Sequence, residues 1–398
     1  MATPDSNPHP NPETTPPVQI GLQIEVAIQS VAFGGEGVAR HGDFVLFVPF
    51  TAPGDTALVE ITEVKKRFGR GRLVKLIHTS PDRVSPRCTY FGECGGCQYQ
   101  HINYSKQLEI KRQQVADLFH RIGQFQSVPV DPVVPCPEPY GYRNRIMVRS
   151  QWSKPEQRLV LGFLRQQDRL VVDVTSCAIA EPELNAQLEA ARLNPPPRGG
   201  LKVAMRVLPP DWTVPPDSFF QNNFHLLPGL VDTVRQRLQE GGCRYLVDAY
   251  CGVGFFGLEM AQHVEAFAGI EMDKPAVRAA RQNAERRNCT NGEFLLGSVE
   301  ELLPSVLTRF NANHTALILD PPRRGCARSA LEFLRQQQPA QILYVSCHPA
   351  TLARDLQILT ENQQYRLERV VPLDMFPQTQ HVELVADLRL QPCQPGPV

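Results

Sequence analysis

The chain has 398 residues, enough for two or three domains, and hydrophobic residues make up 42% of it, which is typical of globular proteins. No apolar run is long enough to span a bilayer. Lysine plus arginine equals aspartate plus glutamate at 41 each, so any nucleic-acid binding must rest on local patches. Eleven cysteines without an export signal argue against disulfides and favour free thiols or metal binding in a reducing cytoplasm.

The first two segments differ sharply in composition. Residues 1–18 are rich in Pro, Asn and Thr and lack an apolar core, so we expect a disordered tail and no secretory signal. Residues 19–79 alternate apolar and polar side chains over short runs separated by turn residues, which predicts a small β-barrel. The runs are 22–28, 43–48, 57–61 and 72–77.

Residues 80–215 form the predicted central domain. A cysteine-rich loop opens it, and apolar residues then recur at helical spacing over about 105–123, a helix that we expect to pack on the following domain. Strand-like runs at 145–148 and 159–164 lie among many prolines, which indicates a mixed, β-rich fold.

Residues 216–398 have a different texture, in which buried-type strands alternate with helical segments. This pattern predicts a doubly wound, Rossmann-like α/β fold with a parallel sheet. The last two strand-like runs, 365–371 and 382–390, have no helix between them, so we expect an antiparallel pair at the sheet edge.

A glycine turn follows the first strand of this domain. Gly252 and Gly254 let the backbone approach a ligand, and Glu271, at the end of the next strand, suits ribose hydroxyls. A third glycine at the spacing of dinucleotide-binding turns is missing, so the pattern favours S-adenosylmethionine, which has ribose but no phosphate. The alternative is an ordinary glycine-rich turn.

Two loops should open beside this turn, because both follow strands of the same sheet. Asp320 begins the first, and Cys347 lies in the second. Carbon 5 of uracil is a poor nucleophile, but a thiolate that adds to carbon 6 activates it. Cys347 suits that role, with its thiolate favoured by the following helix and by Arg323 or Arg324, and Glu383 is the candidate base. The alternative for Cys347 is a small buried hydrophobic residue.

The segments 319–325, 344–355 and 375–383 resemble the RNA 5-methyluridine methyltransferase family, and the barrel resembles its TRAM domain. The resemblance implies Cys347 as nucleophile and Glu383 as proton acceptor. It also implies cofactor contacts at Gln221, Tyr250, Glu271 and Asp320. Three positions depart from the family pattern, and they bear on the adenine contacts: Phe255, His348 and Ser298, the last with Glu300 close by.

Cys88, Cys94 and Cys97 form a C-x5-C-x2-C loop that needs a fourth ligand, for which Cys177 is the best candidate and Cys136 the competitor. The spacing leaves zinc and a four-iron cluster both open, and unligated cysteines are the remaining alternative. The family resemblance implies a [4Fe–4S] cluster on Cys88, Cys94, Cys97 and Cys177.

Two basic-aromatic groups are candidate RNA contacts. The first lies in the barrel and comprises Lys65, Lys66, Arg67, Phe68 and Arg70. The second comprises Tyr140, Tyr142, Arg143 and Arg145. For the barrel group the alternative is a charged edge strand that prevents aggregation.

Together these observations predict a cytoplasmic, monomeric enzyme that methylates carbon 5 of a flipped-out uracil in RNA with S-adenosylmethionine. Large-subunit ribosomal RNA is the favoured substrate from the resemblance, and transfer RNA is the alternative. Two other functions stay open: methylation of a different acceptor such as an amine or a cytosine, and RNA binding without catalysis.

Overall fold

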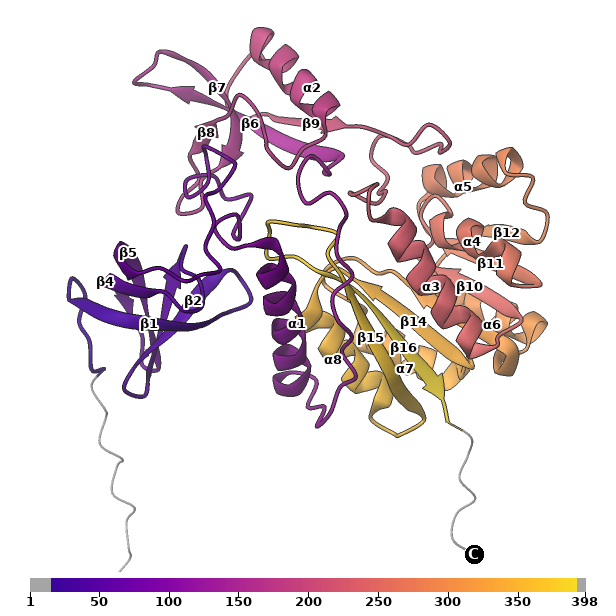
Figure 1. Cartoon of the computed structure of the whole chain (residues 1–398). Helices are drawn as coiled ribbons and strands as arrows, with labels where there is room; N and C mark the ends of the chain where they lie inside the picture. The colour runs from indigo at the N-terminus through magenta and orange to yellow at the C-terminus, as the bar shows by residue number, and fades with distance from the viewer. Residues whose placement is uncertain (1–15, 392–398) are drawn as a thin grey trace, which may run out of the picture. The chain divides into compact units, whose positions relative to one another are not determined.

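The computed structural model describes residues 16–391, which form two compact units divided after Val84 (Figure 1). The predicted central and C-terminal domains belong to one unit. Most of the predicted tail lies outside the described residues, but Val18 is buried in the barrel core, so a tail reaching residue 18 is wrong. Within residues 16–391, no helix is long and apolar enough to cross a membrane.

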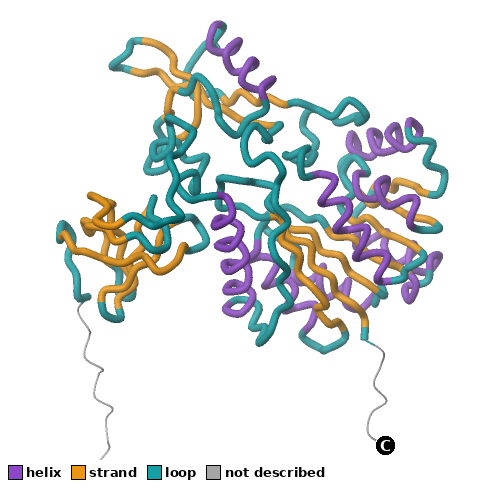
Figure 2. The backbone as a smooth tube through the Cα atoms, viewed as in Figure 1, coloured by secondary structure: helices purple, strands orange, loops and turns teal. Residues whose placement is uncertain are grey.

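The first unit is a closed barrel of five strands in the order β1-β2-β3-β5-β4 (Figure 2). Alternating side chains such as Leu46, Val48, Val59 and Ile61 fill its interior. The strand that the sequence did not predict is β2, whose inward residues are small. The bounds are β1 (Gln23–Val31), β2 (Glu36–His41), β3 (Phe44–Pro49), β4 (Thr56–Val64) and β5 (Phe68–His78).

The central part of the second unit holds helix α1 (Tyr104–Arg121) and a four-stranded antiparallel sheet in the order β8-β7-β6-β9. Helix α2 (Pro182–Leu193) covers one face of this sheet, where Leu184 and Leu188 pack against Ile146 and Val148. The strands are β6 (Arg145–Ser153), β7 (Arg158–Leu164), β8 (Val171–Asp173) and β9 (Lys202–Arg206).

The C-terminal part is a seven-stranded sheet in the order β12-β11-β10-β13-β14-β16-β15. The five strands from β12 to β14 are parallel, and β15 and β16 are the predicted antiparallel pair. Strand β16 lies between β14 and β15 and runs antiparallel to β14, which places its first residue, Glu383, at the carboxyl edge of the parallel strands, beside the end of β14. The strands are β10 (Tyr245–Ala249), β11 (Ala266–Glu271), β12 (Gly292–Leu296), β13 (Thr315–Leu319), β14 (Gln341–Ser346), β15 (Tyr365–Leu373) and β16 (Glu383–Leu390).

Helices cover both faces of this sheet, so its middle strands are buried throughout (Figure 1). One face packs against α3 (Leu227–Gly241), α4 (Phe255–Met260) and α5 (Lys274–Arg286). The other face packs against α6 (Val299–Phe310), α7 (Arg328–Gln337) and α8 (Pro349–Thr360), and α1 contacts α8 on this side. The predicted packing of the 105–123 helix is therefore confirmed. Two short 3-10 helices are η1 (Ala261–His263) and η2 (Ala312–His314).

Candidate active site

A cavity of about 600 Å³ opens at the carboxyl ends of β10, β11, β13 and β14. This is the edge at which parallel α/β sheets place their ligands. Seven of the predicted residues line it: Gln221, Tyr250, Gly252, Glu271, Asp320, Cys347 and Glu383. Sequence reasoning missed two further residues that line the cavity. Phe219 belongs to no recognised motif, and Phe376 lies in the 375–383 segment but has a side chain without acid–base or nucleophilic chemistry.

The turn after β10 has an unusual backbone. Tyr250, Gly252 and Gly254 all have positive φ angles, of 63°, 54° and 85°. Gly252 faces open space, as a ligand-approach position requires, whereas a Cβ on Gly254 would lie 2.6 Å from the Phe294 ring. Gly254 does not line the cavity, so its glycine serves packing beneath the turn.

The carboxylate of Glu271 locks this turn to the end of β11. Its Oε2 accepts a hydrogen bond from the Gly252 amide at 3.0 Å, and its Oε1 accepts from the Met272 and Asp273 amides at 2.7 and 2.9 Å. The side chain therefore has a fixed orientation at the rim of the cavity. Remaining lone pairs on its oxygens can accept from the hydroxyls of a ribose.

A second cavity of about 910 Å³ adjoins the first, since Tyr250, Glu271, Pro321 and Pro322 line both. The structure places all three positions that depart from the family pattern. Ser298 caps α6 by accepting a hydrogen bond from the Glu301 amide, while the neighbouring Glu300 lines the second cavity. His348 caps α8 by accepting at Nδ1 from the Thr351 amide, and Phe255 lines the first cavity.

The pKa of the Cys347 thiol is raised. Burial, followed by the nearby Glu383, raises this pKa to about 11. The Arg323 guanidinium lowers it, as expected of an arginine that favours the thiolate, but the effect of burial is larger.

Of the two carboxyl groups, that of Glu383 is buried and that of Asp320 is half-buried. Burial raises the pKa of Asp320 to about 7, and burial together with Asp320 raises the pKa of Glu383 well above its ordinary value. Burial therefore favours the protonated form of Glu383. A positively charged ligand in this cavity lowers the pKa of all three groups, because it stabilises their ionised forms.

Residues 374–382, here the base loop, connect β15 to β16 and end at Glu383. The Lys111 ammonium, from α1, is fully buried beneath it and donates to Asp374 Oδ1 at 2.5 Å. The same ammonium donates to the carbonyls of Phe376 and His381 at 3.1 and 2.8 Å. One side chain thus fixes three points of the segment that leads to the candidate base.

The glutamine-rich part of the base loop has further anchors. The Gln107 amide group pairs with Gln378 through two hydrogen bonds, of 3.0 and 3.2 Å. The backbone of Gln98 donates to the Gln378 carbonyl at 3.0 Å, and the Gln98 side chain accepts from the Gln380 amide at 3.1 Å. Gln98 directly follows Cys97, so the cysteine loop and the base loop are in direct contact.

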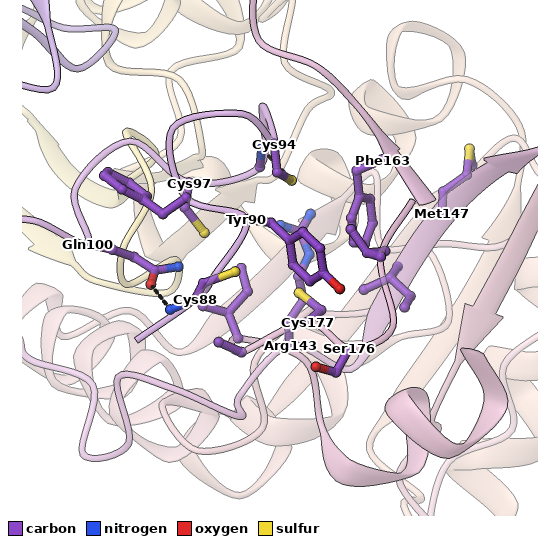
Figure 3. A pocket seen from close by; sticks show the side chains of 16 residues that line it. Cys88, Tyr90, Cys94, Cys97, Gln100, Arg143, Met147, Phe163, Ser176 and Cys177 are labelled. Carbon is purple, nitrogen blue, oxygen red and sulfur yellow. Dashed lines mark hydrogen bonds between the residues drawn. The ribbon is translucent and has the colours of Figure 1, made fainter. Parts of the chain in front are cut away.

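The four cysteines Cys88, Cys94, Cys97 and Cys177 line one cavity of about 230 Å³ (Figure 3). All four are free thiols, and apolar side chains such as Phe163 and Val174 surround them. Burial raises the pKa of Cys94 to about 11 and that of Cys97 to about 12. Among the described residues, no three His, Cys, Asp or Glu side chains are grouped closely enough to hold a single metal ion.

Cys136, the competing fourth ligand, lies elsewhere. It is buried, and its sulfur contacts the Asn223 amide nitrogen at 3.3 Å and the Glu138 carbonyl at 3.1 Å. It does not line the cavity of the other cysteines. The convergence of Cys177 with the C-x5-C-x2-C loop, across some eighty residues of sequence, therefore favours Cys177 as the partner of that loop.

Some of the candidate RNA contacts are exposed side chains outside any ion pair of the described residues, and others are already paired. Lys66 and Arg67 are exposed in the β4–β5 turn, and no ion pair of theirs occurs within residues 16–391. Lys65 pairs with Glu63, and Arg70 pairs with Glu36 and Glu63 and lies over the Phe68 ring.

In the second group, Tyr142 is completely buried, and its hydroxyl donates to the Pro377 carbonyl at 2.9 Å. An RNA-stacking role for Tyr142 is therefore wrong. Its ring instead packs beneath the base loop, where it adds one more anchor. Tyr140 stays partly exposed and carries the Arg87 guanidinium over its ring at 4.4 Å.

Comparisons with known proteins agree with this geometry. Residues 200–389 match the model of the tRNA (uracil-5-)-methyltransferase family, and residues 17–74 match that of the TRAM domain. An uncharacterized RNA methyltransferase of Nostoc sp. is 33% identical over 93% of this chain and 97% of its own length. The tRNA (uracil(54)-C(5))-methyltransferase of Schizosaccharomyces pombe is 31% identical over 92% of this chain and 78% of its own.

A solved structure is also similar along nearly the whole chain. It is the Pyrococcus abyssi tRNA (uracil-54, C5)-methyltransferase in complex with S-adenosyl-L-homocysteine, with a TM-score of 0.68 and 28% identity. The match covers 92% of this chain and all of that one. With the barrel, the cavity and the glycine turn described above, these similarities show that the chain belongs to the RNA uracil-5-methyltransferase family, whose members use S-adenosylmethionine.

Proposed function

We propose that this enzyme methylates carbon 5 of a uracil through a transient covalent bond between Cys347 and the base. The observation that carries the proposal is the convergence of a thiol, two carboxyl groups and the glycine turn on one cavity. A cation that binds near this thiol and its neighbouring carboxyl groups favours the thiolate form. A thiolate is the form that can add to carbon 6 of uracil and so activate carbon 5.

Each bond change in the proposed reaction has an assigned group. Cys347 would add in its thiolate form, after its proton has passed to solvent, and the new bond from sulfur to carbon 6 moves an electron pair through carbon 5 to the carbonyl oxygen at carbon 4. That electron pair would then bond carbon 5 to the methyl group, whose bond to the donor sulfur breaks and leaves S-adenosylhomocysteine. Glu383 in its carboxylate form accepts the proton from carbon 5, the double bond between carbons 5 and 6 re-forms, and the sulfur leaves as a thiolate.

The residues that fit the methyl donor are Gln221, Tyr250, Gly252, Glu271 and Asp320. Glu271 suits the ribose because backbone amides already fix its carboxylate, and Asp320 supplies a buried negative charge. The donor supplies an electrophilic methyl group on a positively charged sulfur, and that charge favours the ionised forms of Asp320, Glu383 and Cys347.

A trapping experiment tests the covalent step. RNA that contains 5-fluorouridine cannot lose a proton from carbon 5, so with S-adenosylmethionine it should leave an adduct that survives denaturation. We expect the wild-type enzyme and the control Cys243→Ala to form it and Cys347→Ala to form none, with methylation reduced at least about a thousandfold. An adduct in the Cys347→Ala variant would refute the assignment.

For the RNA itself, we propose large-subunit ribosomal RNA, on the resemblance to members with both barrel and cysteine cluster. The names of the Schizosaccharomyces pombe and Pyrococcus abyssi relatives support transfer RNA as the second candidate. Mapping 5-methyluridine in both RNA classes from a strain without this gene distinguishes them. Loss from ribosomal RNA alone supports the first candidate, and loss from transfer RNA alone supports the second.

We also propose that Cys88, Cys94, Cys97 and Cys177 hold a [4Fe–4S] cluster. Four thiols around one apolar cavity match the number and kind of ligands that a four-iron cluster takes. When bound, the cluster takes its four ligands as thiolates and removes their mutual repulsion. Free thiols throughout the described chain agree with a cytoplasmic setting.

Anaerobic purification tests the cluster. We expect iron and sulfide in about equal amounts in the wild-type protein and in the control Cys136→Ser, and their loss in Cys97→Ser. Unfolding by urea provides a second readout, because loss of the ligated group should lower the stability of Cys97→Ser but not of the control. One zinc per chain without sulfide would overturn the proposal.

A further inference from the structure

The outer face of the central sheet carries two pairs of like charges. Strands β6 and β9 are antiparallel neighbours, and their register places Arg145 directly opposite Arg206 and Arg149 directly opposite Lys202. Directly opposed side chains have Cβ atoms about 5 Å apart on the same face of a sheet. Two cation–cation pairs therefore stand on one face, separated by a single row.

This face points away from the core. The alternate residues Ile146, Val148 and Met205 pack against α2 on the inner face, so the four cations belong to the opposite one. The row between the two pairs consists of Met147, which is 45% exposed, and Ala204. The result is a basic strip with a small apolar centre.

None of the four cations forms an ion pair with any residue in the described range 16–391. Arg206 donates through Nη1 to the Ser218 carbonyl at 2.9 Å, but its Nη2 is buried without a hydrogen-bond partner. Burial lowers the pKa of Arg206, and the positive charge of Arg145 lowers it further. The second effect is what we expect when no acidic group offsets the repulsion between the two arginines. Asp173, in the same cross-strand row as Arg149, is already bound by Arg158 and Arg192.

Like charges directly opposite each other destabilise a sheet. This repulsion occurs in both rows, and a bound polyanion would offset it in both. The two pairs lie roughly 13 Å apart along the strand, which is about two phosphate spacings of an extended RNA strand. The exposed Met147 between them suits a sugar or base edge better than it suits water.

The strip begins at the rim of the active-site cavity. Arg206 contacts Ser218, which lines that cavity, and Asn144, next to Arg145, donates from its side chain to the Gln221 carbonyl at 2.9 Å. We propose that Arg145, Arg149, Lys202 and Arg206 form a phosphate-binding strip for the RNA backbone next to the target uridine. The inference rests on the proposed function for the identity of the polyanion.

Arg149 and Lys202 form the pair that is farther from the active-site cavity. The double variant Arg149→Gln with Lys202→Gln removes both charges and leaves the residues that line the cavity unchanged. Binding of a fluorescent stem–loop RNA, measured without methyl donor, should weaken about tenfold, and the salt dependence of log K should become shallower by about 1.4 for two lost contacts. At saturating RNA the methylation rate should stay unchanged while KM rises. The unfolding temperature should stay the same or rise, because a repulsive pair is removed.

Two controls make the result specific. Arg244→Gln with Arg309→Gln removes the same charge from residues that already pair with Glu265 and Glu293, and it should leave RNA binding unchanged. The exchange Arg149→Lys with Lys202→Arg keeps both charges and should retain binding. RNA affinity and salt slope equal to wild type in the neutralised variant would overturn the strip. Because binding is measured without catalysis, this outcome is separate from failure of the 5-fluorouridine adduct.

Discussion

The second unit contains two cavities that are both lined by half-buried cysteines, and the surroundings of these cysteines give them different chemistry. Cys347 and Cys97 have similarly raised pKa values, of about 11 and about 12. Cys347 lies with Arg323 and two carboxyl groups at the carboxyl edge of a parallel sheet, whereas Cys97 lies among other thiols and apolar side chains. The pKa of a thiol therefore does not reveal its role, but the neighbours with which it can exchange protons do.

Glu383→Gln should have the largest effect and separates the two cavities most clearly. Gln cannot accept the proton from carbon 5, so turnover should fall by about a thousandfold. Addition of the thiol and transfer of the methyl group do not need that acceptance, so a Cys347 adduct should accumulate on ordinary uridine RNA and be visible by denaturing electrophoresis. Cys97→Ser should accumulate none, and an adduct there would break the distinction between the cavities.

Lys111→Met tests the base loop, which lines the active-site cavity through Phe376 and contacts the cysteine loop through Gln98. Removing one partner of a fully buried ion pair leaves Asp374 uncompensated, so the free energy of unfolding should fall by about 3–5 kcal/mol in urea titrations. The double variant Lys111→Met with Asp374→Leu should recover part of the loss. A loss below about 1 kcal/mol would contradict the role of Lys111 as the main anchor of the base loop.

Asp320→Asn should stabilise the ligand-free protein at neutral pH. The folded-state pKa of Asp320, about 7, lies above its ordinary value of 3.8, so its contribution to stability is full below about pH 4 and is lost as the pH rises toward 7. Asn cannot ionise, so the variant should gain of the order of 1–4 kcal/mol at pH 7 relative to wild type. The gain should vanish near pH 4, and affinity for S-adenosylmethionine should drop. Equal stability at both pH values would show that the carboxyl is not desolvated.

The triple variant Lys65→Gln, Lys66→Gln, Arg67→Gln in the barrel should have the smallest effect. Only Lys66 and Arg67 have no acidic partner among the described residues, so RNA affinity should fall a fewfold and its salt slope should decrease by about 1.4. Iron content and adduct formation should match wild type, because the barrel belongs to neither cavity. The measurement is RNA binding across salt concentrations, and an unchanged slope would remove the barrel turn from the RNA contacts.

Much of the fold could be predicted from local patterns in the sequence. Strands such as β13 and β14 are uniformly apolar and follow helical segments, which predicts a parallel sheet, and the glycine turn is readable from Gly252 and Gly254. Strand β2 was missed because its inward residues are small, so the alternation is weak.

What the sequence did not reveal depends on distant partners. The buried pair of Lys111 and Asp374 joins residues 263 positions apart, and no local periodicity encodes that meeting. Tyr142 was misassigned because an aromatic residue beside arginines reads the same whether it stacks on RNA or fills a core. The net rise of the Cys347 pKa could not be predicted from the sequence, because the burial that outweighs Arg323 comes from the tertiary fold.

The anchoring of the base loop has a consequence for how this enzyme becomes competent. The loop is anchored by four residues that are synthesised long before it: Gln98, Gln107, Lys111 and Tyr142. The segments that hold the loop are therefore present when the last strand of the sheet is made and packs against them. The C-terminal sheet alone contains most of the residues proposed to bind the methyl donor. Without the anchors, however, the loop that ends at Glu383, the proposed proton acceptor, would not be held in place. Catalysis is thus a property of the whole second unit, and transplanting the C-terminal sheet into another protein would transfer donor binding without pyrimidine chemistry.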